Sequence, residues 1–210
     1  MTVAKFNLEG HEDRSGRSGR FGLLRSFGSL ERAAYNRRVQ AGAFWRTVVA
    51  DEANLLDEVV RVLEARVPFC LIGGQAVNAY VEPLVSLDLD VVVAAADVAS
   101  LLAALPPSVQ VETFQHSVNL SRAGSDLRIQ LQTDPRYESF ISRASRRSVL
   151  GMDLPVAAPE DVFQGKIWSV TDPTRRPSKR QKDLADIARL TEKYPYLAAR
   201  VPDEVRRHLM

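Results

Sequence analysis

Residues 71–93 read LIGGQAVNAYVEPLVSLDLDVVV, a stretch that places a Gly-Gly pair ahead of two aspartates on a β-branched run. Alternate residues of a strand share one face, so Asp88 and Asp90 are predicted to point the same way. The repulsion between two such carboxylates is relieved when both bind a divalent cation. The spacing therefore predicts a metal site, although an Asp-x-Asp pair by itself also suits a strand edge that faces solvent.

The glycine pair, Gly73 and Gly74, separates a short strand expected over residues 69–72 from a short helix expected over residues 75–81. Because glycine lacks a side chain, the backbone N–H groups of such a turn can approach an anion closely. This favours phosphate binding at the two glycines, with Ser86 as a further polar group. The same turn can also connect strand and helix without a ligand. The stretch lacks the residues of the Rossmann and Walker motifs, which excludes dinucleotide sites and P-loops of those types.

Composition sets broad limits on the class of protein. The chain has 210 residues, of which 45% are hydrophobic and 26% charged, as is typical of one soluble globular domain or of one domain with an appendage. A net charge of +2 neither favours nor excludes a nucleic-acid partner. The single cysteine, Cys70, excludes an internal disulfide and a cysteine zinc site. No segment resembles a membrane span or a signal peptide, so we expect a cytoplasmic protein that binds no membrane.

Hydrophobic periodicity predicts an α/β fold with mixed strands and helices. We expect four segments: a flexible, arginine-rich segment over residues 1–28, N-terminal helices over 29–66, a sheet-containing core over 67–157 and a helical part over 158–210. The strands are expected at residues 69–72, 87–93, 109–114, 117–121 and 127–133, with two short extended pieces within 148–157. Further helices are expected at residues 96–105, 137–144, 159–170, 181–193 and 203–209.

Charged residues in the helical part are further candidates for a site. Lys166 lies amid apolar residues on an expected helix, where its ammonium group either extends to solvent or points into a cleft and binds phosphate. Asp183 and Asp186 are three positions apart, a spacing that favours ion pairs with Lys179 or Lys182 over metal binding. The densest basic cluster can contact a triphosphate or an RNA backbone, or it can be a solvated loop. It comprises Arg175, Arg176, Lys179, Arg180 and Lys182.

Five motifs, in the order LIGGQAVNAY, VSLDLDVVV, LRIQLQTD, PEDVFQGKIW and KRQKDLADI, resemble the minimal nucleotidyltransferases of the abortive-infection (AbiEii-type) branch of toxin–antitoxin systems. The resemblance covers residues 55–193. It implies a polymerase-β-like core, in which helices flank a mixed sheet, and a C-terminal helical part. It also implies an NTP substrate with Mg²⁺ or Mn²⁺. By this resemblance the residues of the site are Gly73, Gly74 and Ser86 for the triphosphate, Asp88 and Asp90 for the metal, and Lys166 and Asp186 for the cleft.

The third acidic residue of that family falls at Gln130, and an amide cannot act as a general base. Two hypotheses are therefore open. In the first, the protein transfers a nucleoside monophosphate to a hydroxyl of a tRNA end or a protein, with Lys166 stabilising the transition state and the basic cluster docking the acceptor. In the second, it is a catalytically lapsed module that binds nucleotide or a cognate toxin or antitoxin protein. A metal-dependent phosphohydrolase ranks third, since the histidines show no ligand spacing.

Overall fold

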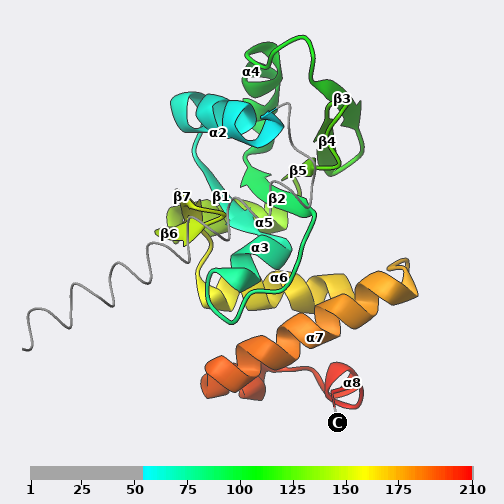
Figure 1. Cartoon of the computed structure of the whole chain (residues 1–210). Helices are drawn as coiled ribbons and strands as arrows, with labels where there is room; N and C mark the ends of the chain where they lie inside the picture. The colour runs from blue at the N-terminus through cyan, green and yellow to red at the C-terminus, as the bar shows by residue number, and fades with distance from the viewer. Residues whose placement is uncertain (1–53, 210) are drawn as a thin grey trace, which may run out of the picture. The chain divides into compact units, whose positions relative to one another are not determined.

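Among the residues that the structure describes, seven strands form one mixed sheet in the order β3-β4-β5-β2-β1-β7-β6 (Figure 1). The computed structural model describes residues 54–209. The segment expected over residues 1–28 and the helical residues expected before position 54 lie outside this range. The strands are β1 (Phe69–Ile72), β2 (Asp88–Val93), β3 (Gln110–Thr113), β4 (Ser117–Ser121), β5 (Arg128–Gln132), β6 (Ser145–Val149) and β7 (Met152–Val156).

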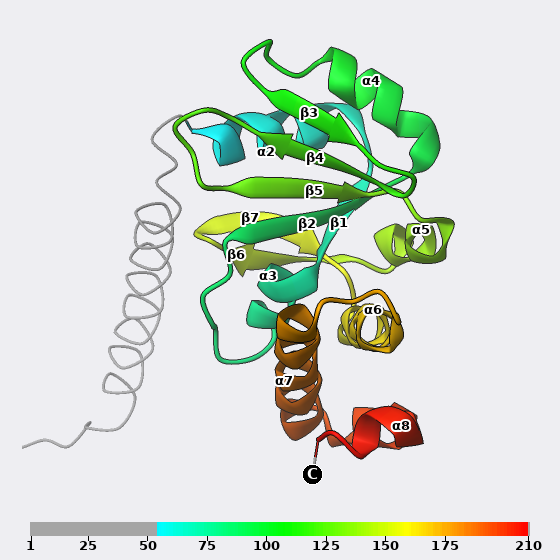
Figure 2. The same cartoon turned by 90° about the vertical axis from the view of Figure 1, so that its right-hand side faces the viewer.

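Helices flank this sheet, as Figures 1 and 2 show. They are α2 (Leu55–Arg66), α3 (Gly73–Asn78), α4 (Val98–Ala103), α5 (Pro135–Ser142), α6 (Pro159–Thr171), α7 (Pro177–Lys193) and α8 (Asp203–Arg206), with short 3-10 turns at Ala95–Asp97 and Pro195–Arg200. In both views α6 and α7 lie side by side, and α3 lies between this pair and the sheet. The expected α/β fold with a mixed sheet is confirmed. Within residues 54–209, no helix is both long enough and apolar enough to cross a bilayer.

The central strand β2 supplies both core and polar residues. Its alternate residues Leu89 and Val91 are fully buried, whereas Asp88 and Asp90 on the other face are half-buried. Full burial of each such apolar side chain contributes about 1.5–3 kcal/mol to stability. Strand β2 pairs antiparallel with β1 and parallel with β5. The burial of Leu89 and Val91 thus anchors β2 in the core, and Asp88 and Asp90 lie on a central strand of the sheet.

The main difference from the sequence-based prediction concerns α7. Its first turn was expected to be loop up to residue 180, but the helix begins at Pro177. Proline is favoured at the first helical position because its fixed φ suits the helix and its missing N–H is not needed there. As a result Lys179 and Lys182 both lie on the helix, three residues apart and on the same side of it. The earlier start of α7 directs these two lysines toward β2.

Candidate functional site

Asp90 lines a small polar cavity. In the sheet its backbone neighbours are Ile72 on β1 and Gln130 on β5. The cavity has a volume of about 120 Å³ and is lined by Gly73, Gln130, Lys166 and Arg175, among others. This is smaller than the roughly 300 Å³ of the smaller ligand pockets, so the cavity suits a reacting group or an ion with water rather than a whole nucleotide.

The charge state of Asp90 depends on its cationic neighbours. Burial raises the pKa of the Asp90 carboxyl, while the ammonium groups of Lys166, Lys179 and Lys182 lower it and the Asp88 carboxylate raises it again. The net direction is upward, because desolvation penalises the charged form more than these lysines stabilise it. A further cation at this position would therefore favour the ionised carboxylate.

Gly73 is required by the close approach of Asp90. Its φ is +68°, in the left-handed region that residues with a Cβ rarely adopt. A Cβ built on Gly73 would lie 1.9 Å from Asp90 Oδ2 and 2.9 Å from Asp90 Cβ, so Asp90 would have to move. The first glycine thus allows the turn and the carboxylate to touch.

Replacing Gly73 by Ala is expected to displace Asp90 and to lower the stability of the fold. The left-handed backbone alone costs about 1–2 kcal/mol for a residue with a Cβ, and the clash with the carboxylate adds to this. Gly124 provides a matched control, since its φ is +81° and no atom lies within 4 Å of a Cβ built there. Urea unfolding of Gly73→Ala and Gly124→Ala should give a clearly larger loss for Gly73→Ala. Equal losses in stability would show that the contact with Asp90 carries no cost.

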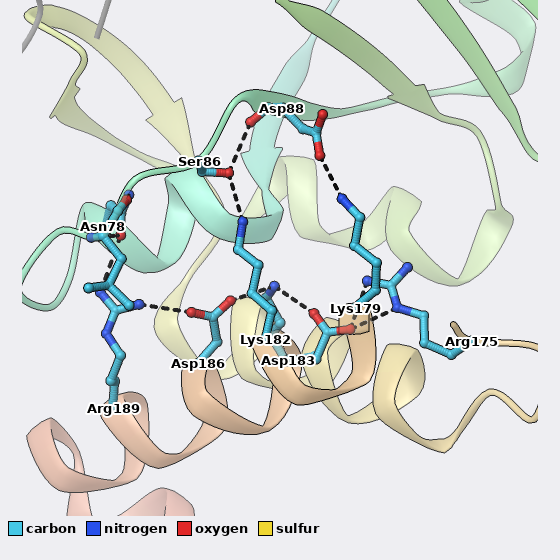
Figure 3. Close-up of polar contacts among 11 residues, drawn as sticks. Asn78, Ser86, Asp88, Arg175, Lys179, Lys182, Asp183, Asp186 and Arg189 are labelled. Atoms are coloured by element: carbon cyan, nitrogen blue, oxygen red, sulfur yellow. Dashed lines mark hydrogen bonds and ion pairs between the residues drawn. The ribbon is translucent and has the colours of Figure 1, made fainter. Parts of the chain in front are cut away.

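The second glycine, Gly74, borders a polar cradle formed with Ser86 and Lys182; Figure 3 shows the contact between Ser86 and Lys182. A Cβ on Gly74 would lie 2.9 Å from Ser86 Oγ and 3.5 Å from Lys182 Nζ. The Lys182 ammonium donates a hydrogen bond of 3.1 Å to Ser86 Oγ. The structure thus brings together Gly74 and Ser86, which were assigned to the triphosphate, and adds an ammonium group that was assigned to acceptor docking.

Lys179 forms an ion pair with Asp88, the other carboxylate on this face of β2. Its ammonium nitrogen lies 2.9 Å from Asp88 Oδ2 (Figure 3). Both side chains are about one-third exposed, at 37% for the lysine and 32% for the aspartate, so the ion pair contributes at most about 1 kcal/mol. A pair this weak can open when a ligand of higher charge reaches Asp88.

The oxygen donors on β2 fit a divalent cation that is shared with a substrate. Mg²⁺ is commonly held by one or two carboxylates together with substrate phosphates and water, and Asp88 and Asp90 supply those carboxylates from one face of one strand. The amide of Gln130 is a neutral oxygen donor opposite Asp90. Within residues 54–209, no three or more His, Cys, Asp or Glu side chains are placed to hold a metal ion. A divalent cation bound to Asp88 and Asp90 would therefore need further oxygen ligands, such as the phosphate oxygens of a bound substrate.

Lys166 belongs to a buried ion network and does not extend to solvent. Its ammonium nitrogen lies 2.9 Å from Asp183 Oδ1 and 2.7 Å from Asp186 Oδ2, and all three side chains are almost fully buried. Burial alone lowers the pKa of Lys166, but attraction to Asp186 and Asp183 outweighs it, so the net pKa is raised. Lys166 thus remains charged and connects α6 to α7.

Two arginines complete the network at its ends. Arg175 lies 2.7 Å from Asp183, and Arg189 lies 2.8 Å from Asp186 (Figure 3). Arg189 also donates to the side-chain oxygen of Asn78, which attaches α7 to the end of α3. The prediction that the two aspartates pair with Lys179 or Lys182 was wrong, because Asp183 and Asp186 are buried against α6 while those lysines reach β2.

The five residues of the basic cluster have different positions and partners in the structure. Lys179 and Lys182 contact β2 and the loop before it, and Arg175 contacts Asp183. Arg180 donates to the carbonyl of Asp172, whereas Arg176 is exposed at the start of α7. The cluster therefore contributes Lys179, Lys182 and Arg175 to the site, and the signal for the position of the two lysines was Pro177 as a helix start.

Sequence reasoning gave no role to a set of residues between α5 and α6. Arg136 and Trp168 line a cavity that borders the one containing Asp90. Their spacing follows no known motif, and they come together only because α5 and α6 pack at the same end of the sheet. No signal in the sequence indicates this contact.

Comparisons with known proteins agree with the architecture. No family model and no curated protein matches the chain. Among solved structures, ANT(2″)-Ia in complex with adenylyl-2″-tobramycin has a TM-score of 0.52 and 15% identity, over 74% of this chain and 97% of that one. The lincosamide antibiotic adenylyltransferase LnuA, lincomycin-bound, has a TM-score of 0.48 and 11% identity, over 68% of this chain and 99% of that one. At such identities the likeness shows the fold alone, and that fold is the polymerase-β-like nucleotidyltransferase fold.

Proposed function

We propose that this protein is a nucleotidyltransferase, which binds an NTP with Mg²⁺ or Mn²⁺ and transfers the nucleoside monophosphate to a hydroxyl of a macromolecule. One observation carries the proposal: a Gly-Gly turn, two carboxylates and two lysines from α7 converge at one end of β2. This is the combination that a nucleoside triphosphate and its metal require. The likeness in fold to nucleotidyltransferases supports the same reaction class.

In this proposal each group has a defined role. Asp88 and Asp90 would hold the metal, which would supply positive charge that polarises the phosphates. The cradle of Gly74, Ser86 and Lys182 holds the triphosphate. Lys179, which pairs with Asp88 in this structure, would be free to contact the phosphate oxygens if Asp88 held a metal.

Lys166 is proposed to act as a positioning residue rather than to contact the phosphates. Its ion pairs with Asp183 and Asp186 fix the rotation of α7, and this rotation directs Lys179 and Lys182 toward β2. Its charge also favours the ionised form of Asp90, on the evidence of its effect on the pKa of that carboxyl. Asp186 thus acts through Lys166 and α7.

The transfer step forms one bond and breaks one. The acceptor hydroxyl oxygen bonds to the α-phosphorus, and the bond from that phosphorus to the bridging oxygen of the leaving pyrophosphate breaks. The hydroxyl proton passes to solvent water, because Gln130 opposite Asp90 cannot accept it. Transfer is consequently expected to be slower than in a site with a third carboxylate.

A catalytically lapsed module is the second candidate, and Gln130 is the observation that favours it. Such a module would bind nucleotide through the same carboxylates and glycines without moving the α-phosphate. We also propose, from the sequence motifs, that the protein belongs to the AbiEii-type branch and has a cognate toxin or antitoxin partner. This applies both to the enzyme and to the lapsed module.

The two candidates are separated by following the α-phosphate. The purified protein is incubated with Mg²⁺ and each α-labelled NTP, and with total tRNA, cell protein or an aminoglycoside as acceptor. If the protein is a nucleotidyltransferase, label should appear on a macromolecule and pyrophosphate should be released. Nucleotide binding without labelled product would support the module, and release of inorganic phosphate without transfer would support a phosphohydrolase.

A further inference from the structure

Two lysines of α7 contact polar atoms of β2 and of the loop before it. The ammonium nitrogen of Lys179 lies 2.9 Å from Asp88 Oδ2, and that of Lys182 lies 3.1 Å from Ser86 Oγ (Figure 3). The two lysines are three residues apart on α7, so their side chains leave the same side of the helix. Both ammonium groups also lower the pKa of the Asp90 carboxyl. Their positive charges therefore lie beside both carboxylates of β2.

Lys179 and a divalent cation would require the same carboxylate. A Mg²⁺ ion bound to Asp88 Oδ2 would lie about 2.1 Å from this oxygen, and hence no more than about 5 Å from an ammonium group that kept its contact with it. Two cations this close repel each other. Binding of either one to Asp88 therefore weakens binding of the other.

The Lys179 ammonium can leave Asp88 without movement of α7. The helix is held by buried ion pairs, in which Lys166 of α6 contacts Asp183 and Asp186 and the three side chains are 8%, 2% and 2% exposed. The side chain of Lys179 is 37% exposed, and its ammonium group is carried by a flexible stem. An ion pair between exposed groups is weak. The lysine side chain is therefore the part that can change partner while the helix stays in place.

The cost of this exchange depends on a second partner for the displaced ammonium. With a divalent cation alone, Lys179 would lose Asp88 and remain close to another positive charge. A triphosphate in the cradle of Gly74, Ser86 and Lys182 would offer anionic oxygens beside the same face of α7. Hydrogen bonds from an ammonium group to phosphate oxygens are roughly twice as strong as bonds between neutral groups. The exchange is therefore favoured by a triphosphate and opposed in its absence.

We propose that Lys179 makes metal binding depend on the nucleotide, because its ammonium group holds Asp88 until a triphosphate provides another partner. Mg²⁺ alone is then bound weakly, whereas the metal and the triphosphate are bound together. This role of Lys179 rests on the proposed function for the identity of the second partner. The competition between Lys179 and a cation for Asp88 is measurable without any nucleotide.

The first measurement is Mn²⁺ binding to the full-length protein without nucleotide, followed by the electron paramagnetic resonance signal of free Mn²⁺. Lys179→Met is expected to raise the affinity for Mn²⁺ about fivefold, which corresponds to about 1 kcal/mol. Lys179→Arg keeps the charge and should retain the low affinity of the parent protein. Lys193→Met is the matched control, since it removes the same charge from an exposed position in the last turn of α7. An unchanged or lower affinity in Lys179→Met would overturn the proposal.

A second variant shows whether the competition takes place at Asp88. When Asp88→Asn is already present, adding Lys179→Met should no longer raise the affinity for Mn²⁺, because the shared carboxylate is missing. The same fivefold rise in this background would show that Lys179 acts only through its general charge, which contradicts the proposal. Thermal unfolding of these variants excludes a folding defect, since both side chains are about one-third exposed.

Binding of a non-hydrolysable NTP analogue at saturating Mg²⁺ should change in the opposite direction. Lys179→Met is expected to weaken this binding about tenfold, because an ammonium contact to the phosphate oxygens is lost. Equal or tighter binding of the analogue in Lys179→Met would overturn the proposal. If both effects are found but the parent protein transfers no label, the proposed transfer reaction is contradicted and the role of Lys179 in binding is supported.

Discussion

Asp88→Asn and Asp90→Asn are each expected to lower the rate of nucleotide transfer by at least about a hundredfold. Each substitution would remove one charged oxygen ligand from the proposed metal site, and a bound divalent metal contributes several kcal/mol to stabilising the charge that develops in such a transition state. About 2.7 kcal/mol corresponds to a hundredfold in rate. The measurement is the initial rate of α-label transfer at saturating Mg²⁺, with the acceptor that the parent protein labels.

A control and a binding measurement make this prediction specific. Asp203→Asn changes an exposed carboxyl on α8 and should leave the rate unchanged. Mn²⁺ binding in the presence of a non-hydrolysable NTP analogue should weaken in both site variants and not in the control. Unchanged transfer in the double variant Asp88→Asn/Asp90→Asn would falsify the assigned metal role.

Lys166→Met is expected to destabilise the protein by about 3 kcal/mol, because it leaves Asp183 and Asp186 buried without their shared ammonium partner. Urea unfolding measures this loss. Lys193→Met is the control, since it removes an exposed lysine from the last turn of α7. The double variant Lys166→Met/Asp186→Asn should lose less free energy of unfolding than the sum of the losses in the two single variants. The reason is that residue 186 then carries no charge that needs a partner. A loss below about 1 kcal/mol for Lys166→Met would show that water replaces the ammonium group.

The pH dependence of this loss follows from the pKa of Lys166. The folded-state pKa is raised above the ordinary value of 10.5, so the ammonium is charged in both folded and unfolded protein below that value. Its contribution to stability is complete there and is lost only as the pH rises through the folded-state pKa. The difference between the parent protein and Lys166→Met should therefore be the same at pH 7 and at pH 9.

Much of the fold was predictable because it depends on local pattern. The alternation in Asp88–Val93 and the apolar run Phe69–Ile72 indicate strands by themselves, and both were found. The shared face of Asp88 and Asp90 follows from the period of an extended chain. The position of Gln130 beside Asp90 also agrees with the strand predicted next to it. Element boundaries were less accurate, and the start of α7 at Pro177 mattered most.

The sequence by itself therefore determined the strands, the helix pattern and the residue types available at the centre of the sheet. Only the tertiary structure decided which charges meet. On α7, Lys179 lies four residues before Asp183 and Lys182 lies four residues before Asp186, a spacing that allows ion pairs along the helix. This spacing contains no information about Lys166 on another helix. The packing of α6 against α7 buries both aspartates beside Lys166, and Lys179 is then available to Asp88. Ion pairing depends on distance and burial in space, and both are set by how helices pack rather than by their separation along the chain.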